Sequence, residues 1–294
     1  MCAPLRIAPL TTVAEYAECE RLQQLIWESD AIDVVPRHLL MTFQRHGGMV
    51  LGAFDAAGQM VGFAFGFLGQ TAPDNAAASG GTWQHCSHEL GVVSEWRGRG
   101  VGYRLKLAQR EWVLRQGIDL VTWTYDPLEL ANASLNIGKL GALCRCYLRD
   151  FYGKMSDSLN AGLPSDRFEV AWRLASPRVV RRVQDGWRRP SLAELTQTGA
   201  VIVNPGEVDA ERIVRPGVVQ RCQASRVLVE VPANFQTLKK TSLDLALAWR
   251  LHSREALEAY FSGGYTASDV LMAEAAAAGT RRAYYLLERT DDPA

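Results

Sequence analysis

The sequence predicts an α/β (α+β) protein of two domains, with a mixed sheet in the first and a smaller α+β arrangement in the second. The chain has 294 residues, enough for about two domains. Its first part alternates apolar strand patterns with helical patterns in the order β, αα, β, β, β, α, β, α, β, β. After the strand pattern that ends at Leu174, the composition changes and the chain becomes rich in arginine. We therefore expect one domain at residues 1–176 and another at residues 177–294.

Local signals define the elements of the first domain. Thr12 with Glu15 three residues later reads as a capping box before a helix that ends near Trp27. Residues Ala56, Ala57 and Gly58 read as a hairpin turn between two strands. The elements expected are a strand at 5–10, the helix after Thr12, a helix at 36–45, strands at 49–55 and 59–69, a polar loop at 71–81, a strand at 88–93, a helix from 101 to about 116, a strand at 120–125, a short helix at 133–140, and strands at 142–152 and 167–174.

The second domain is expected to begin with an arginine-rich, solvated connector at 176–191. It continues with a strand at 226–231, a loop at 232–236, a helix at about 242–261 and strands at 265–272 and 282–288. Gly263 and Gly264 end the helix. These elements could be a degenerate second copy of a β-α-β core, but no sequence repeat is strong enough to assert one.

Composition narrows the class of protein. There are 32 basic and 32 acidic side chains, so the formal net charge is zero, which argues against nucleic acid or an anionic membrane as the main partner. Six cysteines in a chain of this length do not resemble a disulfide framework. The N-terminal stretch lacks an apolar signal region, and no window approaches a membrane span. We expect a cytoplasmic protein.

The most informative stretch is a strand, a glycine turn and a helix. Residues 97–102 read Arg-Gly-Arg-Gly-Val-Gly, and Val101, Leu105, Ala108 and Trp112 then recur on one helical face. A helix N-terminus carries unpaired amides and partial positive charge, and glycines let the backbone close on an anion, so the turn is expected to bind phosphate. The spacing fits neither the Rossmann fingerprint nor the P-loop, which argues against a plain dinucleotide or ATP site.

Arg97-x-x-Gly100-x-Gly102, after an apolar strand and before a long helix, resembles the R/Q-x-x-G-x-G/A signature of the GNAT superfamily of acyl-CoA-dependent N-acyltransferases. The order of elements over about residues 3–176 resembles the family's as well, in a subgroup with an extended C-terminal half. The resemblance implies a mixed sheet splayed between its fourth and fifth strands, with acetyl-CoA or another acyl-CoA as co-substrate and no metal. It implies these coenzyme-binding residues: Val92, Val93, Arg97, Gly98, Arg99, Gly100, Val101, Gly102 and Asn132, the last also expected to cap its helix.

Family members commonly place a base on the fourth strand, where His88 and Glu89 are the candidates. Neighbours on a strand point to opposite faces, so we expect only one of them to face the cleft, and we favour His88 because imidazole titrates near neutrality. His85 and Cys86 beside His88 do not make a metal site, because a strand does not converge residues i and i+3 on one ion.

The catalytic acid departs from the family pattern. The family's usual tyrosine position is Ile137 here, which cannot donate a proton, and the alternative donors are Tyr147 and Tyr152, expected on the strand at 142–152. A coenzyme A thiolate can also leave without enzymic protonation.

The resemblance implies an N-acyltransferase for the amine of a small molecule such as an amino acid. One of Arg145, Arg149 and Arg173 could bind a substrate carboxylate in bidentate fashion. Two alternatives stay open, a succinyl-CoA-dependent D-amino acid N-succinyltransferase and a non-catalytic acyl-CoA-binding module. The partner expected is a small-molecule amine, with a possible homodimer, and neither nucleic acid nor membrane.

Overall fold

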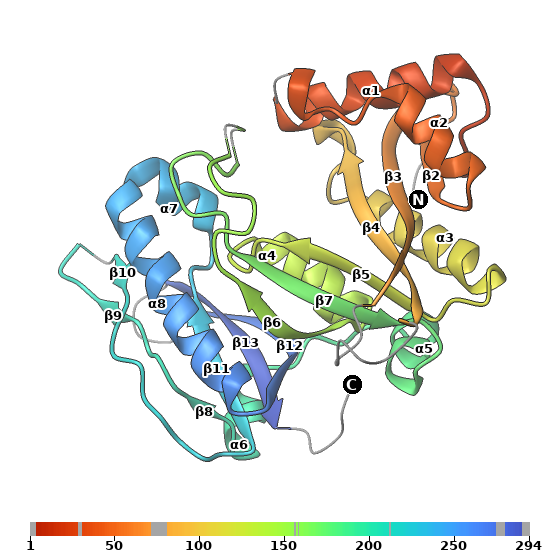
Figure 1. Cartoon of the computed structure of the whole chain (residues 1–294). Coiled ribbons are helices and arrows are strands. Elements are labelled where there is room, and N and C mark those ends of the chain that lie inside the picture. The colour runs from red at the N-terminus through yellow and green to blue at the C-terminus, as the bar shows by residue number, and fades with distance from the viewer. Residues whose placement is uncertain are drawn as a thin grey trace. The chain divides into compact units, whose positions relative to one another are not determined.

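The computed structural model describes residues 4–28, 31–71, 81–155, 157, 159–211, 213–274 and 280–289 (Figure 1). The contacts divide the chain into two compact units. Unit 1 comprises Met1–Trp123, Ser156–Ala161 and Arg173–Ser176, and unit 2 comprises Thr124–Met155, Gly162–Trp172 and Pro177–Ala294. The domain division at 1–176 and 177–294 stays a prediction. Most of the polar loop expected at 71–81 lies outside the described residues.

Unit 1 is a sheet with helices on both faces. The strand order is β1-β2-β3-β4-β5, antiparallel throughout except for the parallel pair β4 and β5. Helices α1 and α2 pack on one face and α3 packs on the other. The elements are β1 (Arg6–Pro9), α1 (Val13–Trp27), a 3-10 turn (Ala31–Asp33), α2 (Arg37–Arg45), β2 (Met49–Phe54), β3 (Met60–Gln70), β4 (Trp83–Val92), a 3-10 turn (Ser94–Trp96), α3 (Val101–Arg115) and β5 (Leu120–Tyr125).

Local sequence chemistry accounts for these elements. Thr12 caps α1, with its Oγ1 accepting from the Glu15 amide at 3.2 Å while the Glu15 carboxylate accepts from the Thr12 amide at 3.0 Å. This confirms the predicted capping box. Gly58, at φ 79°, turns the hairpin between β2 and β3. Strand β5 has the predicted bounds, whereas β4 begins earlier than predicted because the polar residues from Trp83 onward pair with β3.

Strand β4 contains a bulge at His88. Glu89 pairs with Phe65 and Ser87 pairs with Gly66, so β4 has one residue more than β3 between these pairs. A bulge breaks the alternation of side chains along a strand. Consecutive residues His88 and Glu89 therefore lie on the same face, which corrects the expectation that only one of them could do so.

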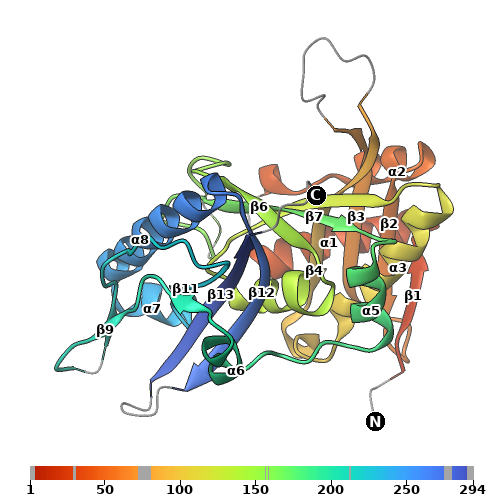
Figure 2. The same cartoon turned by 90° about the horizontal axis from the view of Figure 1, so that it is seen from below.

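Unit 2 is built around a second set of strands in the order β7-β6-β12-β13-β11-β8, with a separate β9–β10 pair. Helix α8 packs across β6, β11 and β12 (Figure 2). The elements are α4 (Leu130–Ala133), a π-helical segment (Ser134–Lys139), β6 (Leu143–Leu148), β7 (Arg167–Arg173), α5 (Pro177–Gln184), α6 (Leu192–Gln197), β8 (Val201–Ile202), β9 (Glu207–Val208), β10 (Val214–Arg215), β11 (Arg226–Val231), α7 (Phe235–Thr241), α8 (Leu243–Ser262), β12 (Tyr265–Glu274) and β13 (Arg281–Arg289).

Three expectations about unit 2 were wrong. The N-cap of α4 is Glu129, so Asn132 lies inside that helix and is not its cap. Strand β6 ends at Leu148, which leaves Tyr152 in the loop that follows. The arginine-rich connector is partly helical, because Val179 is buried and Arg182 bonds to Asp269 at 2.7 Å, so much of it is packed rather than solvated.

No helix within the described ranges is both long enough and apolar enough to span a membrane.

Candidate active site

Strands β4 and β5 pair over two residues and then separate. The parallel pairs are His85 with Val121 and Cys86 with Thr122. Within the described chain, β4 has no further pair with β5, while its pairing with β3 continues to Val92. The unpaired edge of β4 therefore presents backbone donors and acceptors to an extended ligand, as sheet edges do when they bind peptides.

The turn that follows β4 leads into the N-terminus of α3. The Val93 amide donates to the Val61 carbonyl at 3.0 Å and so holds the end of the strand. Gly98 and Gly100 have φ values of 74° and 80°, and a Cβ at either position would meet nothing within 4 Å. Backbone conformation, rather than crowding, therefore requires glycine at both positions.

The amides of this turn are available for an anion. Gly100 is the N-cap of α3 and supplies no side-chain cap. In the part of the chain that the structure describes, no acceptor bonds to the amides from Gly98 to Tyr103, and the first amide of the helix with a partner is that of Arg104, which bonds to the Gly100 carbonyl at 3.1 Å. Unpaired amides at a helix N-terminus form an anion site.

The two arginines of the turn bond locally. Arg97 Nε donates to the Val92 carbonyl at 3.1 Å, and its guanidinium also reaches the Ile26 carbonyl at 3.5 Å. Arg99 lies over the ring of Trp96, with 5.4 Å between guanidinium carbon and centroid. Arg97 thus fixes the turn against β4, and both side chains add positive charge beside the free amides.

His88 and Glu89 lie together on the face of the sheet that α1 and α2 cover. The His88 ring packs edge-on against Phe65, and its Nε2 is 3.9 Å from Oε1 of Glu89. Glu89 is 18% exposed, and its buried Oε2 has no hydrogen-bond partner in the described structure. Burial raises the pKa of Glu89 to about 7 and lowers the pKa of His88. Glu89 can therefore exchange a proton near neutral pH.

A strand splayed from its parallel neighbour, followed by a bare-amide turn and a helix, occurs here within the order β-αα-βββ-α-β-α-ββ. This is the order of elements that the sequence predicted for the first part of the chain. No protein-family model matches the chain, and no curated protein matches it.

Several solved structures of acetyltransferases match part of the chain at low sequence identity. The ribosomal-protein-S18-alanine N-acetyltransferase from Escherichia coli is 12% identical, covers 59% of this chain and 96% of its own, and has a TM-score of 0.44. An N-acetyltransferase from Staphylococcus aureus Mu50 is 16% identical, with 58% and 99% covered and a TM-score of 0.43. NAA60 from Arabidopsis thaliana is 14% identical, with 57% and 97% covered and a TM-score of 0.44.

The two tyrosines differ in availability. Tyr147 is largely buried and donates to Oδ2 of Asp166 at 2.6 Å, and burial raises its pKa further. Tyr152 is 49% exposed, with its hydroxyl 2.9 Å from Oγ1 of Thr124 on β5. Ile137, which the resemblance expects at the usual tyrosine position, is fully buried. Tyr152 is therefore the more exposed of the two tyrosines.

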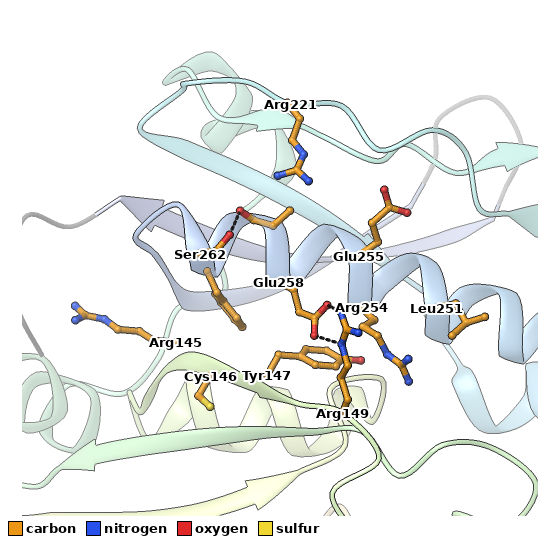
Figure 3. Close-up of a pocket in the computed structure, with 12 residues that line it drawn as sticks. Arg145, Cys146, Tyr147, Arg149, Arg221, Leu251, Arg254, Glu255, Glu258 and Ser262 are labelled. Carbon is orange, nitrogen blue, oxygen red and sulfur yellow. Dashed lines mark hydrogen bonds and ion pairs between the residues drawn. The ribbon is translucent and has the colours of Figure 1, made fainter. Parts of the chain in front are cut away.

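Of the three arginines expected near a substrate carboxylate, Arg145 and Arg149 lie in unit 2 and Arg173 lies in unit 1. Arg145 and Arg149 line an open groove of about 660 Å³ in unit 2, between β6 and α8 (Figure 3). There Arg149 forms a bidentate ion pair with Glu258, with both distances 2.5 Å, and Arg145 Nε donates to Thr266. Arg173 lies in unit 1 at the end of β7 and is exposed. Among the described residues, no three His, Cys, Asp or Glu side chains gather as metal ligands.

Among the buried charged residues that the sequence did not reveal, Lys106 and Arg250 lie next to the elements of the site. Lys106 on α3 is 3% exposed, and its only sequence signal is that it shares a helical stripe with Gln109 and Val113, both buried. Arg250 on α8 is 2% exposed and binds both carboxylate oxygens of Asp126, at 2.7 and 2.5 Å. These two partners are 124 residues apart in the chain, so no local pattern could reveal them.

Further contacts hold the same segment after β5. The Tyr285 hydroxyl on β13 donates to the Pro127 carbonyl at 2.6 Å, and Gln236 at the start of α7 bonds to Glu129. Together with Arg250 these side chains fix the connection between β5 and α4 from three elements beyond residue 176.

Proposed function

We propose that this protein is an acyl-CoA-dependent N-acyltransferase that acetylates, or otherwise acylates, the amine of a small molecule, with an amino acid or related compound as acceptor. The observation that carries the proposal is the run of unpaired amides from Gly98 to Tyr103 beside the splayed edge of β4. A diphosphate fits such a turn, and a pantetheine amide fits an unpaired strand edge. Arg97, Arg99, Val92, Val93, Val101 and Gly102 complete the proposed coenzyme site.

Glu89 is the proposed general base. The acceptor's amine nitrogen attacks the thioester carbonyl, its proton passes to the Glu89 carboxylate directly or through water, and the carbon–sulfur bond then breaks to release coenzyme A thiolate. A base whose pKa lies near 7 combines ionisation at neutral pH with the ability to accept a proton. His88 lies on the same face as Glu89, and its imidazole can donate or accept a hydrogen bond there. Tyr152 stays the sequence-based candidate for the proton donor to the thiolate, which can also leave without a proton from the enzyme.

A pair of variants at Gly100 tests the coenzyme site. Gly100→Glu and Gly100→Gln introduce side chains of the same size at the same positive φ, so both bear the same backbone strain, but only glutamate adds a carboxylate at the turn. We expect calorimetric titration with coenzyme A to show a further loss of at least about tenfold in affinity for Gly100→Glu, because like charges repel at short range. Equal affinities for the two variants would refute coenzyme binding at this turn.

A thiol-release assay distinguishes an enzyme from a non-catalytic binding module. The second alternative stays under consideration because Ile137, which the resemblance expects at the usual tyrosine position, is buried and cannot donate a proton. The assay combines acetyl-CoA or succinyl-CoA with L-amino acids, D-amino acids and short peptides with a free N-terminus. Release with succinyl-CoA and D-amino acids alone would identify a D-amino acid N-succinyltransferase. Thermal stabilisation by acyl-CoA without any release would favour the binding module.

A further inference from the structure

A buried lysine lies where β4 and β5 separate. Lys106 Nζ donates to Ser87 Oγ at 2.8 Å and to Gln109 Oε1 at 3.1 Å, and it is 3.6 Å from the ring centroid of Trp123. Ser87 is the first residue of β4 beyond the two-pair ladder with β5, and Trp123 is the first such residue of β5. Lys106 therefore bridges the two strands at the residues where their pairing ends.

The same lysine connects three parts of the proposed coenzyme site. It belongs to α3, whose N-terminus carries the unpaired amides. Its partner Ser87 directly precedes the bulge residue His88, and Glu89 follows. Its ring contact, Trp123, lies on β5. Lys106 thus belongs to the helix that follows the turn, and its amine contacts a residue beside the bulge and a residue of the second strand.

Close packing around the bulge of β4 restricts the position of the backbone there. His85 is fully buried on the same face, and a Cβ on Gly66 opposite the bulge would lie within 2.6 Å of the Cys86 carbonyl oxygen. The register at the bulge is therefore fixed by close packing against β3. Burying an amine is costly, and burial lowers the pKa of Lys106 to about 7, although the Trp123 ring favours the charged form. A methionine would fill the same space without that penalty, so stability alone does not explain a lysine here.

We propose that Lys106 is a positioning residue that sets the separation of β4 and β5, and with it the fit of the acyl-CoA thioester beside Glu89. The inference deepens the proposed function and rests on it. Displacements of about 1 Å in such a site can cost about a hundredfold in rate.

The test is a comparison of Lys106→Met with a matched control, Lys240→Met, an exposed lysine on α7. We expect Lys106→Met to keep or raise the melting temperature while it lowers kcat/KM for acyl-CoA by about ten- to a hundredfold. Lys240→Met should change neither. A Lys106→Met protein with wild-type kcat/KM would overturn the proposal, whatever its melting temperature.

Two further measurements keep the result interpretable. Ser87→Ala removes only the β4 partner, and its effect on kcat/KM should not add to that of Lys106→Met, because both break one interaction. Full additivity would contradict the bridge. Hydrogen exchange at the amides of β4 and β5 needs no ligand, and Lys106→Met should speed exchange beside the Cys86–Thr122 pair. If wild-type protein binds no acyl-CoA, the proposed function fails, whereas unchanged exchange refutes the bridge itself.

Discussion

Replacing Glu89 by glutamine separates a base from a structural carboxylate. Glu89 is 18% exposed, and burial raises its pKa from 4.5 to about 7. At about 1.4 kcal/mol per pH unit, ionising this group in the folded protein costs roughly 3 kcal/mol more than in the unfolded chain. Because the folded pKa is raised, the protein loses that stability as the pH rises from about 4.5 to about 7. Glu89→Gln should therefore be stabilising by up to about 3 kcal/mol at pH 8 and by nothing at pH 4.

Activity should change in the opposite direction. Wild-type kcat/KM is expected to rise with pH through a midpoint near 7, and Glu89→Gln should lower it by about 10²- to 10⁴-fold and remove this limb. The measurements are urea unfolding at pH 4 and pH 8, and a pH–rate profile by thiol release. Glu111→Gln, an exposed glutamate on α3, is the matched control and should resemble wild type in both. A variant that keeps the limb near pH 7 would refute Glu89 as the base, and loss of the limb in His88→Gln alone would assign it to the imidazole.

Four other substitutions test parts of the fold and the site. Arg250→Met removes the bidentate partner of the buried Asp126 and should lower the free energy of unfolding in urea by about 3–5 kcal/mol. Adding Asp126→Leu should restore most of that loss. An Arg250→Met protein as stable as wild type would contradict this expectation. Thr12→Ala removes the cap of α1 and should cost about 1 kcal/mol, and an unchanged urea midpoint would show that the cap contributes nothing. Tyr147→Phe should lower stability by about 1–3 kcal/mol because a buried carboxylate loses a donor, while Tyr152→Phe should chiefly lower kcat, by about tenfold or more. Unchanged turnover in Tyr152→Phe would remove that hydroxyl from the mechanism.

Local sequence patterns predicted the parts of unit 1 whose structure depends on residues adjacent in the chain. The capping box at Thr12, the turn at Gly58 and the bounds of β5 each follow from a few adjacent side chains. The glycines at 98 and 100 indicated a turn ahead of α3, and both have positive φ, whereas anion binding at this turn stays a prediction.

Features that depend on distant partners were not predictable. The bulge that brings His88 and Glu89 to one face is set by the register of β4 against β3, which the sequence of β4 does not contain. The raised pKa of Glu89 comes from burial under the helices that cover that face, so the preference for His88 drawn from ordinary imidazole titration did not anticipate it. Lys106 looked like any helical lysine because its burial depends on residues of both β4 and β5.

The contacts that Arg250 and Tyr285 make with the segment after β5 limit how far the protein can be shortened from its C-terminus. A chain that stops near residue 176 keeps Asp126 and Pro127 but loses Arg250 and Tyr285, which saturate their oxygens in the intact protein. The shortened chain would leave the Asp126 carboxylate without the guanidinium that pairs with it, so we expect poor yield of soluble material. Any recombined chain would therefore have to replace both sides of these contacts at once.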